Sequence, residues 1–518
     1  MVYCKSCGEN ISEDIDTLVC GHDVHVPCFH LWRDQCVSQK NIITCFVCMK
    51  EQPFESFKIS KCMTRFTAII QKLEMDKKTF QFDGVRWLVE NELKPESLYG
   101  VRGGLLGDDM GLGKTITMTG LAMSNHLKRT LFIVPPILMD QWNTQITNII
   151  PVDKVLVYHG NSKSITKDEI KQFPIVISTY GEITLTKKHS LLHDIEWSRI
   201  IFDEAHHLRT PNTARYNGAR ALKARIRWLV SGTPIQNKKN DFYALCGLLG
   251  LPSEYYRVKD NLKELSKNFI LRRTKEKIGI KMTELHISDE TVEWGNDAEK
   301  QMAKSIHGGL QFSNVPGYTG GPSKFALLTR AKQVCVLPRL LATPFHLDPT
   351  DEAVSATSKI DQVVSDILNK KDNGDGKLIF CQFHEEMKEI EHRLKDNGMH
   401  VAIIDGSVST IKRNKILHSK YQALILQIQT CCEGLNLQGN YNEVYFVSPH
   451  WNPCIEEQAI ARCHRIGQTK PVTVTRYEMT GFDDNTHVPE VPTKTIDKYI
   501  HETQDKKKAI SVEMLIHT

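Results

Sequence analysis

Short apolar runs alternate with longer mixed segments in two separate stretches of the chain. The first stretch has TLFIV at 130 to 134, VLVYH at 155 to 159, IVIST at 175 to 179 and RIIFD at 199 to 203. The pattern restarts with KLIFC at 377 to 381, VAIID at 401 to 405, ALILQ at 423 to 427 and EVYFV at 443 to 447. The intervening segments are long enough for crossover helices, so each stretch predicts a parallel sheet covered by helices. The predicted fold class is α/β, with two parallel-sheet lobes.

Three other segments have a helical or irregular pattern. KCMTRFTAIIQKL places Phe66, Ile69, Ile70 and Leu73 at helical spacing, which predicts a helix with one buried face. Residues 250 to 345 lack the strand alternation and predict helices followed by a Gly/Pro-rich loop, NVPGYTGGPS. The tail TIDKYIHETQDKKKAISVEML has apolar ends and a polar middle, which favours a terminal helix that braces the lobes.

Composition narrows the class of protein. A chain of 518 residues with 41% hydrophobic and 25% charged residues predicts two or three soluble domains. No apolar run approaches the roughly 18 residues that span a bilayer, and the start MVYCKSC has no secretory pattern, so we expect an intracellular protein without a membrane partner. A net charge of +5 permits contact with a polyanion but does not identify one.

Cysteine and histidine pairs near the start have metal-ligand spacing. Eight residues could saturate two tetrahedral zinc ions: Cys4, Cys7, Cys20, His22, His25, Cys28, Cys45 and Cys48. So short a segment has too little core to fold alone, so zinc would supply much of its folding energy. We expect the remaining cysteines to be buried thiols and predict no disulfides.

The order of these ligands resembles a histidine-containing RING finger. The resemblance implies that Cys4, Cys7, His25 and Cys28 hold one zinc ion, and that Cys20, His22, Cys45 and Cys48 hold the other. It also implies that Trp32 contacts a ubiquitin-conjugating enzyme. Lys5 and Phe46 depart from the usual apolar residue and proline of the family. Two interpretations stay open: a ubiquitin ligase, or a zinc module that only packs or binds another protein.

A second chemical motif is the glycine-rich segment GDDMGLGKTIT at 107 to 117, which follows a predicted helix and precedes a helix-like segment. Backbone N–H groups at a helix start can cradle phosphate oxygens. Lys114 would neutralise the β and γ phosphates of ATP, and Thr115 would ligate Mg²⁺. Downstream, RIIFDEAHH ends an apolar strand with Asp203 and Glu204, which predicts one carboxylate for the metal and one for the attacking water.

With these motifs the chain resembles superfamily 2 helicase-like ATPases, and its flanking motifs resemble the SWI/SNF-related branch of DNA translocases. The first lobe carries FQFDGVRWL, FIVPPILMDQW, ISTY and SGTPIQN; the second carries LIFCQFHEEM, EGLNL and QAIARCHRIGQTKPV. The resemblance implies two RecA-like lobes, adenine recognition by Gln81 and arginine fingers at Arg462 and Arg465. It also implies further nucleotide contacts from Asp108, Gly111, Gly113 and Gln458.

The resemblance further implies a monomeric, DNA-stimulated ATPase that moves along duplex DNA and remodels protein–DNA complexes or DNA structures, in the nucleus or another DNA-containing compartment. Thr179, Ser407 and Asn436 would contact DNA phosphates, so binding should depend on salt and not on base sequence. SGTP and HRIGQ favour this branch over RNA helicases of the DEAH type, which remain an alternative. Another is a ubiquitin ligase whose ATPase part only targets DNA.

Two further features qualify the resemblance. Cys431 and Cys432 replace the paired glycines that are common in the EGLNL motif, and the compact length is similar to that of members from large DNA viruses. The predicted domains are a RING-type finger at 1 to 52, a linker helix at 53 to 75, a first lobe at 76 to 255, a helical protrusion and linker at 256 to 358, a second lobe at 359 to 480 and a brace helix at 481 to 518.

Overall fold

A computed structural model describes residues 7, 15–17, 22–25, 28–29, 31–32, 44–45, 47–50, 54–94, 98–160, 165–185, 190–233, 238–308, 310, 322–431, 435–482 and 494–515. The chain divides between Thr274 and Lys275 into two compact units.

The first unit begins with a small two-stranded element and a long helix. Strands β1 (Ile15–Thr17) and β2 (Asp23–His25) pair antiparallel. Val24, Phe29 and Cys45 form a small buried cluster beside them. Helix α2 (Phe54–Lys72) then runs to the main sheet, and it buries Phe66, Ile69 and Ile70 as the helical pattern predicts.

The main sheet of the first unit is seven-stranded and parallel throughout. Its order is β5-β6-β4-β7-β8-β3-β9. The strands are β3 (Arg102–Leu106), β4 (Thr130–Val134), β5 (Val155–Val157), β6 (Ile175–Thr179), β7 (Glu196–Phe202), β8 (Lys223–Val230) and β9 (Ile270–Leu271). Strands β4 and β6 are buried at every position, as expected for a sheet covered on both faces.

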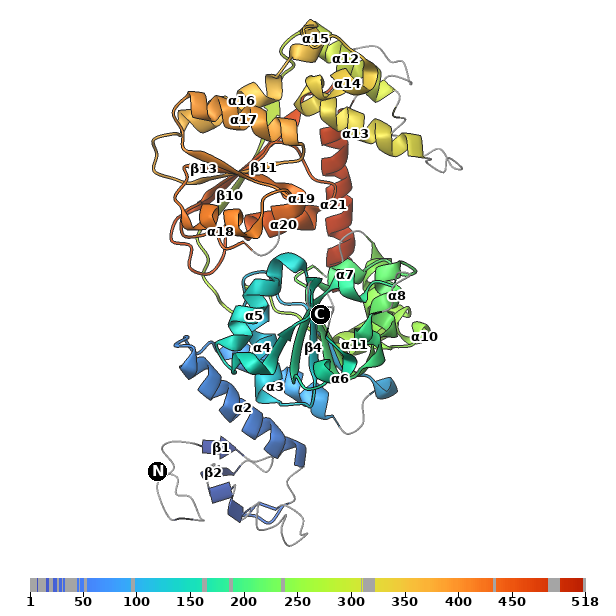
Figure 1. Ribbon diagram of the computed structural model, residues 1–518, viewed down its shortest axis with the longest axis vertical. Coiled ribbons are helices and arrows are strands. Elements are labelled where there is room, and N and C mark those ends of the chain that lie inside the picture. Colours follow the sequence, from blue (N-terminus) through green and yellow to red (C-terminus); the bar gives the residue numbers. More distant parts are fainter. Residues whose placement is uncertain are drawn as a thin grey trace. The chain divides into compact units, whose positions relative to one another are not determined.

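Helices cover this sheet (Figure 1). They are α3 (Thr79–Leu93), α4 (Lys114–Ser124), α5 (Met139–Thr147), α6 (Lys167–Ile170), α7 (Tyr180–Ile183), α8 (Ala214–Ala221), α9 (Lys239–Leu249), α10 (Ser253–Tyr256) and α11 (Leu262–Phe269). Helices α2, α3 and α4 pack against one another, and their apolar residues share one core with alternate residues of the strands.

The second unit contains a six-stranded parallel sheet of order β10-β15-β14-β11-β13-β12. The strands are β10 (Leu285–Val292), β11 (Lys377–Cys381), β12 (Val401–Ile404), β13 (Ala423–Gln427), β14 (Glu443–Phe446) and β15 (Val472–Met479). Along β11, Leu378 and Phe380 enter one apolar cluster and Ile379 and Cys381 enter the other, so both faces of the sheet are cores.

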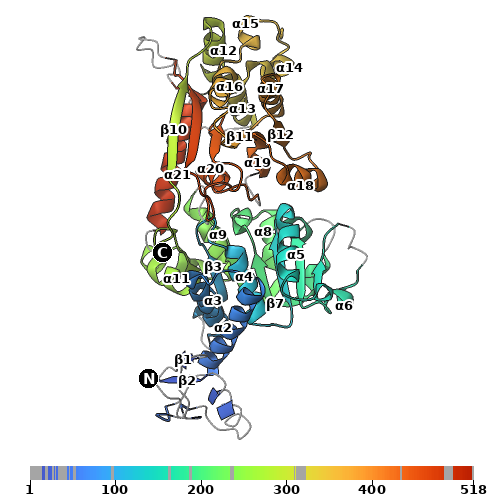
Figure 2. The ribbon, with the colours of Figure 1, turned by 90° about the vertical axis from the view of Figure 1, so that its left-hand side faces the viewer.

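Helices of the second unit lie on both faces of the sheet and beyond one end of it (Figure 2). They are α12 (Asp297–Gly308), α13 (Pro322–Val336), α14 (Ala342–Phe345), α15 (Glu352–Ser355), α16 (Ser358–Asn369), α17 (His384–Asp396), α18 (Thr410–His418), α19 (Ile428–Cys431), α20 (Pro453–Ile460) and α21 (Ile496–Leu515). Helix α21 packs against α13, α20 and β15 of the same unit, so the C-terminal segment is helical as predicted.

The α/β fold class and all eight predicted strands are confirmed, but strands β1, β2, β3, β8, β9, β10 and β15 were missed. The phosphate loop therefore follows a strand directly, not a helix. Strand β3 reads RGGLL because added Cβ atoms on Gly103 and Gly104 would meet Arg227 O at 2.0 Å and Phe269 O at 2.4 Å. Close backbone packing selects glycine here, and glycine obscures the strand pattern.

The domain limits also differ from the prediction. The first unit extends beyond residue 255, because β9 pairs with β3 at its edge. The segment 256 to 358, predicted to be helical, also contains β10, which pairs with β15 along its whole length. Seven of the eight residues of β10 are exposed, so this edge strand lacks the apolar pattern of a buried one.

Candidate nucleotide site and zinc finger

The loop between β3 and α4 has the geometry of a phosphate cradle. Gly113 precedes the helix with φ 78° and ψ 38°, and Gly111 also has a positive φ of 87°. No side chain caps the start of α4, so its first N–H groups have no side-chain acceptor. The Lys114 ammonium donates to the backbone oxygens of Asp108 at 2.9 Å and Asp109 at 3.3 Å. Two neutral carbonyl oxygens of the loop thus accept from the Lys114 ammonium, and a phosphate group could replace them as the acceptor.

The Asp108 carboxylate, next to the phosphate loop, is bound within the protein. Its carboxylate is fully buried and accepts from the Arg273 guanidinium through Nε at 3.0 Å and Nη2 at 2.5 Å. Arg273 also donates to the Phe80 carbonyl oxygen, and its own carbonyl accepts from Asp109 N at 3.0 Å. Asp108 therefore anchors the phosphate loop to the segment that follows β9. The basic run LRRTKEK at 271 to 277 supplies its partner, Arg273.

Gln81 lies beside the phosphate loop, on the first turn of α3. Its side chain is 3% exposed, and its Nε2 lies 3.5 Å from the Leu112 carbonyl oxygen. The amide oxygen Oε1 is buried and makes no hydrogen bond. A Cβ on Gly113 would lie 2.6 Å from Gln81 Nε2, so the two segments are in close contact. This unpaired oxygen could accept a hydrogen bond from an amino group of a ligand.

The two predicted catalytic carboxylates follow the carboxyl end of β7. Asp203 accepts from Trp142 Nε1 at 2.7 Å and from Glu204 N at 3.0 Å. Burial, and then the neighbouring Glu204 charge, raise the pKa of the Asp203 carboxyl far above its ordinary value. A divalent cation would relieve that cost by compensating the negative charge. Trp142 ends the segment FIVPPILMDQW, and no local pattern predicts that it orients Asp203.

Glu204 adopts a strained backbone conformation, with φ 47° and ψ 50°. Such values are rare for a residue other than glycine, and they accompany functional sites. Its Oε2 lies 3.3 Å from His206 Nδ1, which in turn is 3.4 Å from Ser231 Oγ. Ser231 N donates to Leu106 O, immediately before the phosphate loop. The structure thus connects DEAH, SGTP and the phosphate loop within one unit.

In the second unit, the three predicted nucleotide residues belong to one segment around α20. Gln458 is buried, and neither atom of its amide has a hydrogen-bond partner. Arg462 donates to Gln458 O at 3.0 Å and Leu435 O at 3.4 Å. Burial, and then the Arg462 charge, lower the pKa of Arg465. Two neighbouring guanidinium groups create a local positive field suited to an anion.

The three candidate DNA contacts have different environments. Ser407 and Asn436 of the second unit are exposed, although Ser407 donates through both N and Oγ to Asp405. Thr179 of the first unit is 1% exposed, and its Oγ1 lies 3.4 Å from His159 Nδ1. The structure therefore presents two of the three to solvent. Cys431 ends α19, and Cys432 lies outside the described residues.

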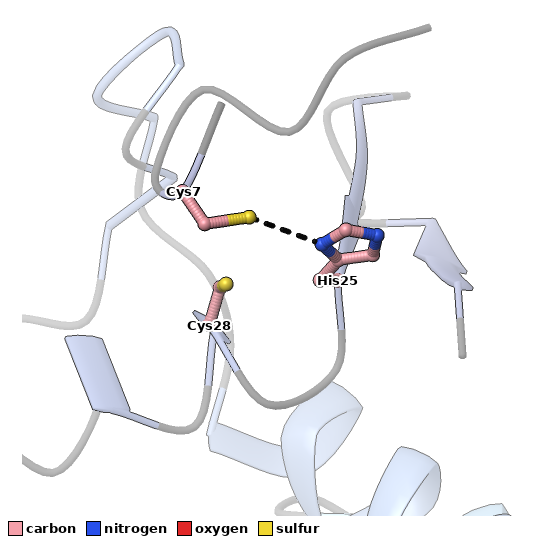
Figure 3. A group of neighbouring side chains, drawn as sticks. All are labelled: Cys7, His25 and Cys28. Atoms are coloured by element: carbon pink, nitrogen blue, oxygen red, sulfur yellow. Dashed lines mark hydrogen bonds between the residues drawn. The ribbon is translucent and has the colours of Figure 1, made fainter. Parts of the chain in front are cut away.

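The described cysteine and histidine ligands form two groups. Cys7, His25 and Cys28 place their ligand atoms within 4.8 Å of one another, with Cys7 Sγ 3.3 Å from His25 Nδ1 (Figure 3). His22, Cys45 and Cys48 form the second group, by the same criterion. Each group has three members of one quartet that the RING resemblance implies. The fourth members, Cys4 and Cys20, lie outside the described residues.

Trp32 is half-buried and packs against the apolar cluster of this segment. Its indole Nε1 donates to Thr44 O at 3.0 Å. The neighbouring Leu31 is 70% exposed. The indole therefore helps to hold the finger together, and an exposed apolar side chain stands beside it.

Comparison with known families matches the two sheet-bearing regions separately. Residues 80–259 match the SNF2-related domain, and residues 358–467 match the helicase conserved C-terminal domain. The chain is therefore similar to proteins that carry an SNF2-related domain followed by a helicase conserved C-terminal domain. The nucleotide-site residues of the first unit all fall inside the first match, except Arg273.

Curated relatives share this core. The chain is 27% identical to the "Probable global transactivator" of Orgyia pseudotsugata multicapsid polyhedrosis virus, over 82% of this chain and 88% of that protein. It is 26% identical to "DNA excision repair protein ERCC-6-like" of Danio rerio and 25% identical to "ATP-dependent DNA helicase DDM1" of Arabidopsis thaliana. Those matches cover 73% and 77% of this chain, but only 33% and 58% of the larger proteins.

A solved structure is also similar. The Sulfolobus solfataricus SWI2/SNF2 ATPase core in complex with dsDNA is 25% identical, with 85% of this chain and 93% of that chain covered and a TM-score of 0.37. Among the described residues, no helix is both long and apolar enough to cross a bilayer.

Proposed function

We propose that the protein hydrolyses ATP to move along duplex DNA and remodel protein–DNA complexes or DNA structures. The observation that carries this proposal is the convergence at one sheet edge of an uncapped helix start with Lys114, the Asp203 and Glu204 carboxylates, and the buried Gln81 amide. This set matches a nucleoside triphosphate and its metal. The SNF2-related match supports movement on DNA.

The residues present fit ATP and Mg²⁺. Lys114, with its ammonium on two carbonyls, would compensate phosphate charge, and the N–H groups of the loop would bind phosphate oxygens. Thr115 and Asp203 would hold the metal shell, which supplies a Lewis acid for phosphoryl transfer when bound. Glu204, already oriented by His206, would position the attacking water. Gln81 Oε1 would accept from the adenine amino group.

The DNA substrate is proposed from the family match and from the two exposed polar side chains, Ser407 and Asn436. Contacts of this kind reach phosphates, so we expect affinity to fall steeply with salt and to vary little with base sequence. Each ATP turnover would change the grip of the two units on one DNA strand, with Arg465 as the contribution of the second unit to hydrolysis. Such a protein would work in a compartment that contains DNA.

ATP turnover with and without duplex DNA tests this function. We expect duplex DNA to raise turnover many-fold, single strands and RNA to raise it less, and Glu204→Gln to remove it by about 10²–10⁴-fold while ATP still binds. Glu254→Gln, a carboxylate change on the exposed surface of α10, serves as the matched control. Equal turnover with and without DNA would refute the DNA-dependent motor, and stronger stimulation by RNA would favour an RNA helicase.

The finger is proposed to bind two structural zinc ions. Its support is the meeting of Cys7, His25 and Cys28 in one place and of His22, Cys45 and Cys48 in another. The fit rests on the donor set, because thiolates and imidazoles are the ligands that Zn²⁺ prefers. We expect about two zinc ions per chain by elemental analysis and about one in Cys45→Ser. Met49→Ala, at an exposed neighbouring position, should keep both.

Ubiquitin ligation is a second candidate function of the same finger. The exposed Leu31 beside the half-buried Trp32 favours a protein partner there. A ubiquitin-conjugating enzyme would dock on this surface. Leu31→Arg should remove ubiquitin chain formation without loss of zinc, since Trp32 keeps its bond to Thr44. If no conjugating enzyme supports chain formation by the unaltered protein, the finger is a binding module.

A further inference from the structure

The first unit contains a large cavity that none of the motifs above uses. Its volume is about 870 Å³, within the range of about 300–1,000 Å³ typical of small-molecule sites. Helix α2 forms part of its wall, together with the segments that lead into β3, β4, β7 and β8. All four strands are parallel, so the cavity lies at the amino edge of the sheet. The phosphate loop and Asp203 follow the opposite, carboxyl edge.

The lining is strongly cationic. Four arginines face the cavity: Arg65, Arg102, Arg129 and Arg225. Three lysines join them: Lys58, Lys61 and Lys128. Among the described lining residues, two are carboxylates, Glu92 and Glu196. The resulting excess of five positive charges equals the net charge of the whole 518-residue chain.

One of those carboxylates, Glu92, is already paired with a buried arginine. Glu92 is 2% exposed and accepts from Arg199 through Nε at 2.6 Å and Nη2 at 2.5 Å. It also accepts from Trp228 Nε1 at 2.8 Å and Asn125 Nδ2 at 2.6 Å. Glu92 therefore compensates a buried arginine outside the lining, and it offers little compensation to the cavity itself.

Three of the arginines are held by backbone oxygens. Arg65 donates to Ser124 O at 3.1 Å, Arg102 to Glu92 O at 2.9 Å, and Arg129 to Glu196 O at 3.3 Å. A guanidinium has five N–H donors, so a single carbonyl orients each group and leaves donors for a ligand. Burial, and then the charges of Arg65 and Arg199, lower the pKa of His126 on the same wall. The cavity thus repels a further cation and suits an anion.

We propose that this cavity binds a small molecule that carries several phosphate groups. Guanidinium groups match phosphate oxygens in a bidentate way, and several phosphates on one compact ligand match the several fixed cations. The volume of about 870 Å³ suits a small molecule better than a length of DNA duplex. Single-stranded nucleic acid usually requires stacking on aromatic rings. Among the described lining residues, the one Trp, Tyr or Phe is Trp197, which is 1% exposed and bonded to Leu192 O.

Binding of myo-inositol hexakisphosphate, used as a probe, to the full chain tests the site by titration calorimetry. We expect one saturable site. The triple variant Lys61→Gln, Lys128→Gln and Arg225→Gln should weaken it by about tenfold or more, because three exposed lining cations are lost. The matched control removes three exposed cations of the same unit outside the cavity: Arg215→Gln, Lys259→Gln and Lys263→Gln. It should stay within about twofold of the unaltered chain.

Lys114→Ala separates the cavity from the phosphate loop, and it should bind the probe as the unaltered chain does. Absence of saturable binding, equal weakening in the two triple variants, or loss of binding in Lys114→Ala would each overturn the site. An oligothymidylate or an oligoglutamate peptide that competes more tightly than the probe would overturn the ligand class. Circular dichroism of each variant distinguishes lost binding from lost folding, and an unfolded triple variant is replaced by Arg225→Gln alone, with Arg215→Gln as its control.

Discussion

The carboxyl edge of the first sheet and the interior of the second unit treat charge in opposite ways. In the first, Asp203 and Glu204 are adjacent acids, and Lys114 is held by carbonyl oxygens. In the second, two buried lysines each have a carboxylate partner. Lys359 Nζ lies 2.5 Å from Asp497, and Lys377 Nζ lies 3.5 Å from Glu443.

The difference separates groups kept for chemistry from groups kept for stability. Adjacent like charges at a sheet edge raise the free energy of the folded state, and they persist where a ligand compensates them. A buried opposite pair gives no such opening, because each charge already has its partner. At the amino edge of the first sheet, Glu92 and Arg199 also form a buried pair of opposite charge. Adjacent like charges are therefore a feature of the nucleotide site and not of the first unit as a whole.

The largest expected effect concerns Arg465, which departs from the opposite-pair pattern of its unit. Its neighbour is another arginine, and burial and that charge lower its pKa. If Arg465 stabilises charge during hydrolysis, Arg465→Ala should lower DNA-stimulated turnover by about 10³–10⁵-fold, as for other arginine fingers. ATP binding, measured by fluorescence with a nucleotide analogue, should persist. Arg339→Ala, at an exposed arginine of the same unit, is the control; comparable losses in both would contradict the assignment.

The next effect concerns the buried ion pair of Lys359 and Asp497, which joins α16 to α21. Lys359 on α16 and Asp497 on α21 are 1% and 0% exposed, so Lys359→Met leaves a buried carboxylate without its partner. We expect a loss of about 3–5 kcal/mol in the free energy of unfolding of the second unit. Hydrogen exchange should show lower protection in α21 and unchanged protection in α4. A second change, Asp497→Leu, should recover part of the loss; an equal loss of protection in both units would break the comparison.

A smaller effect depends on pH and also belongs to the second unit. Burial, and then the charge of Lys332, lower the pKa of His450 to about 4 from 6.5. Because the unfolded chain takes up the proton first, stability is full above pH 6.5 and falls as the pH approaches 4. The loss should reach about 2–3 kcal/mol. Urea unfolding at several pH values checks it: His450→Gln should flatten the dependence, whereas His392→Gln, at an exposed histidine, should not.

The chemistry-bearing residues could be predicted from sequence more fully than the strands. Lys114, Asp203 and Glu204 occur in dense local motifs, and the structure places them at one sheet edge. Strand β10 was missed because an edge strand exposes seven of its eight residues and lacks an apolar pattern. Strand β3 was missed because close backbone contacts require two glycines, which read as a turn.

The residues that support the site were hardest to predict, because their partners are distant in sequence. The Asp108 carboxylate binds Arg273, 165 residues away, and no local pattern predicts that partner. Nothing in the sequence of the basic run around Arg273 indicates that this arginine pairs with a buried carboxylate. The cationic cavity could not be predicted either, since its arginines and lysines come from four separate segments between residues 58 and 225. Local patterns report chemistry, and tertiary contacts decide which charges meet.

The smallest predicted effect has opposite signs in two measurements. Gln81 Oε1 is buried without a partner, so it lowers the stability of the nucleotide-free first unit. Gln81→Leu removes that cost at similar volume, and we expect the free energy of unfolding to rise by about 1 kcal/mol. The same change removes the acceptor proposed for the adenine amino group, so ATP should bind about tenfold more weakly while GTP changes little. Gln145→Leu, at a glutamine of α5 that bonds Thr119, is the control for general effects on this unit. A gain in stability without loss of ATP affinity would show that the unpaired Gln81 Oε1 is a packing defect and not a ligand contact. Asp203 and Glu204 would then be the groups at this edge whose unfavourable charges a ligand compensates.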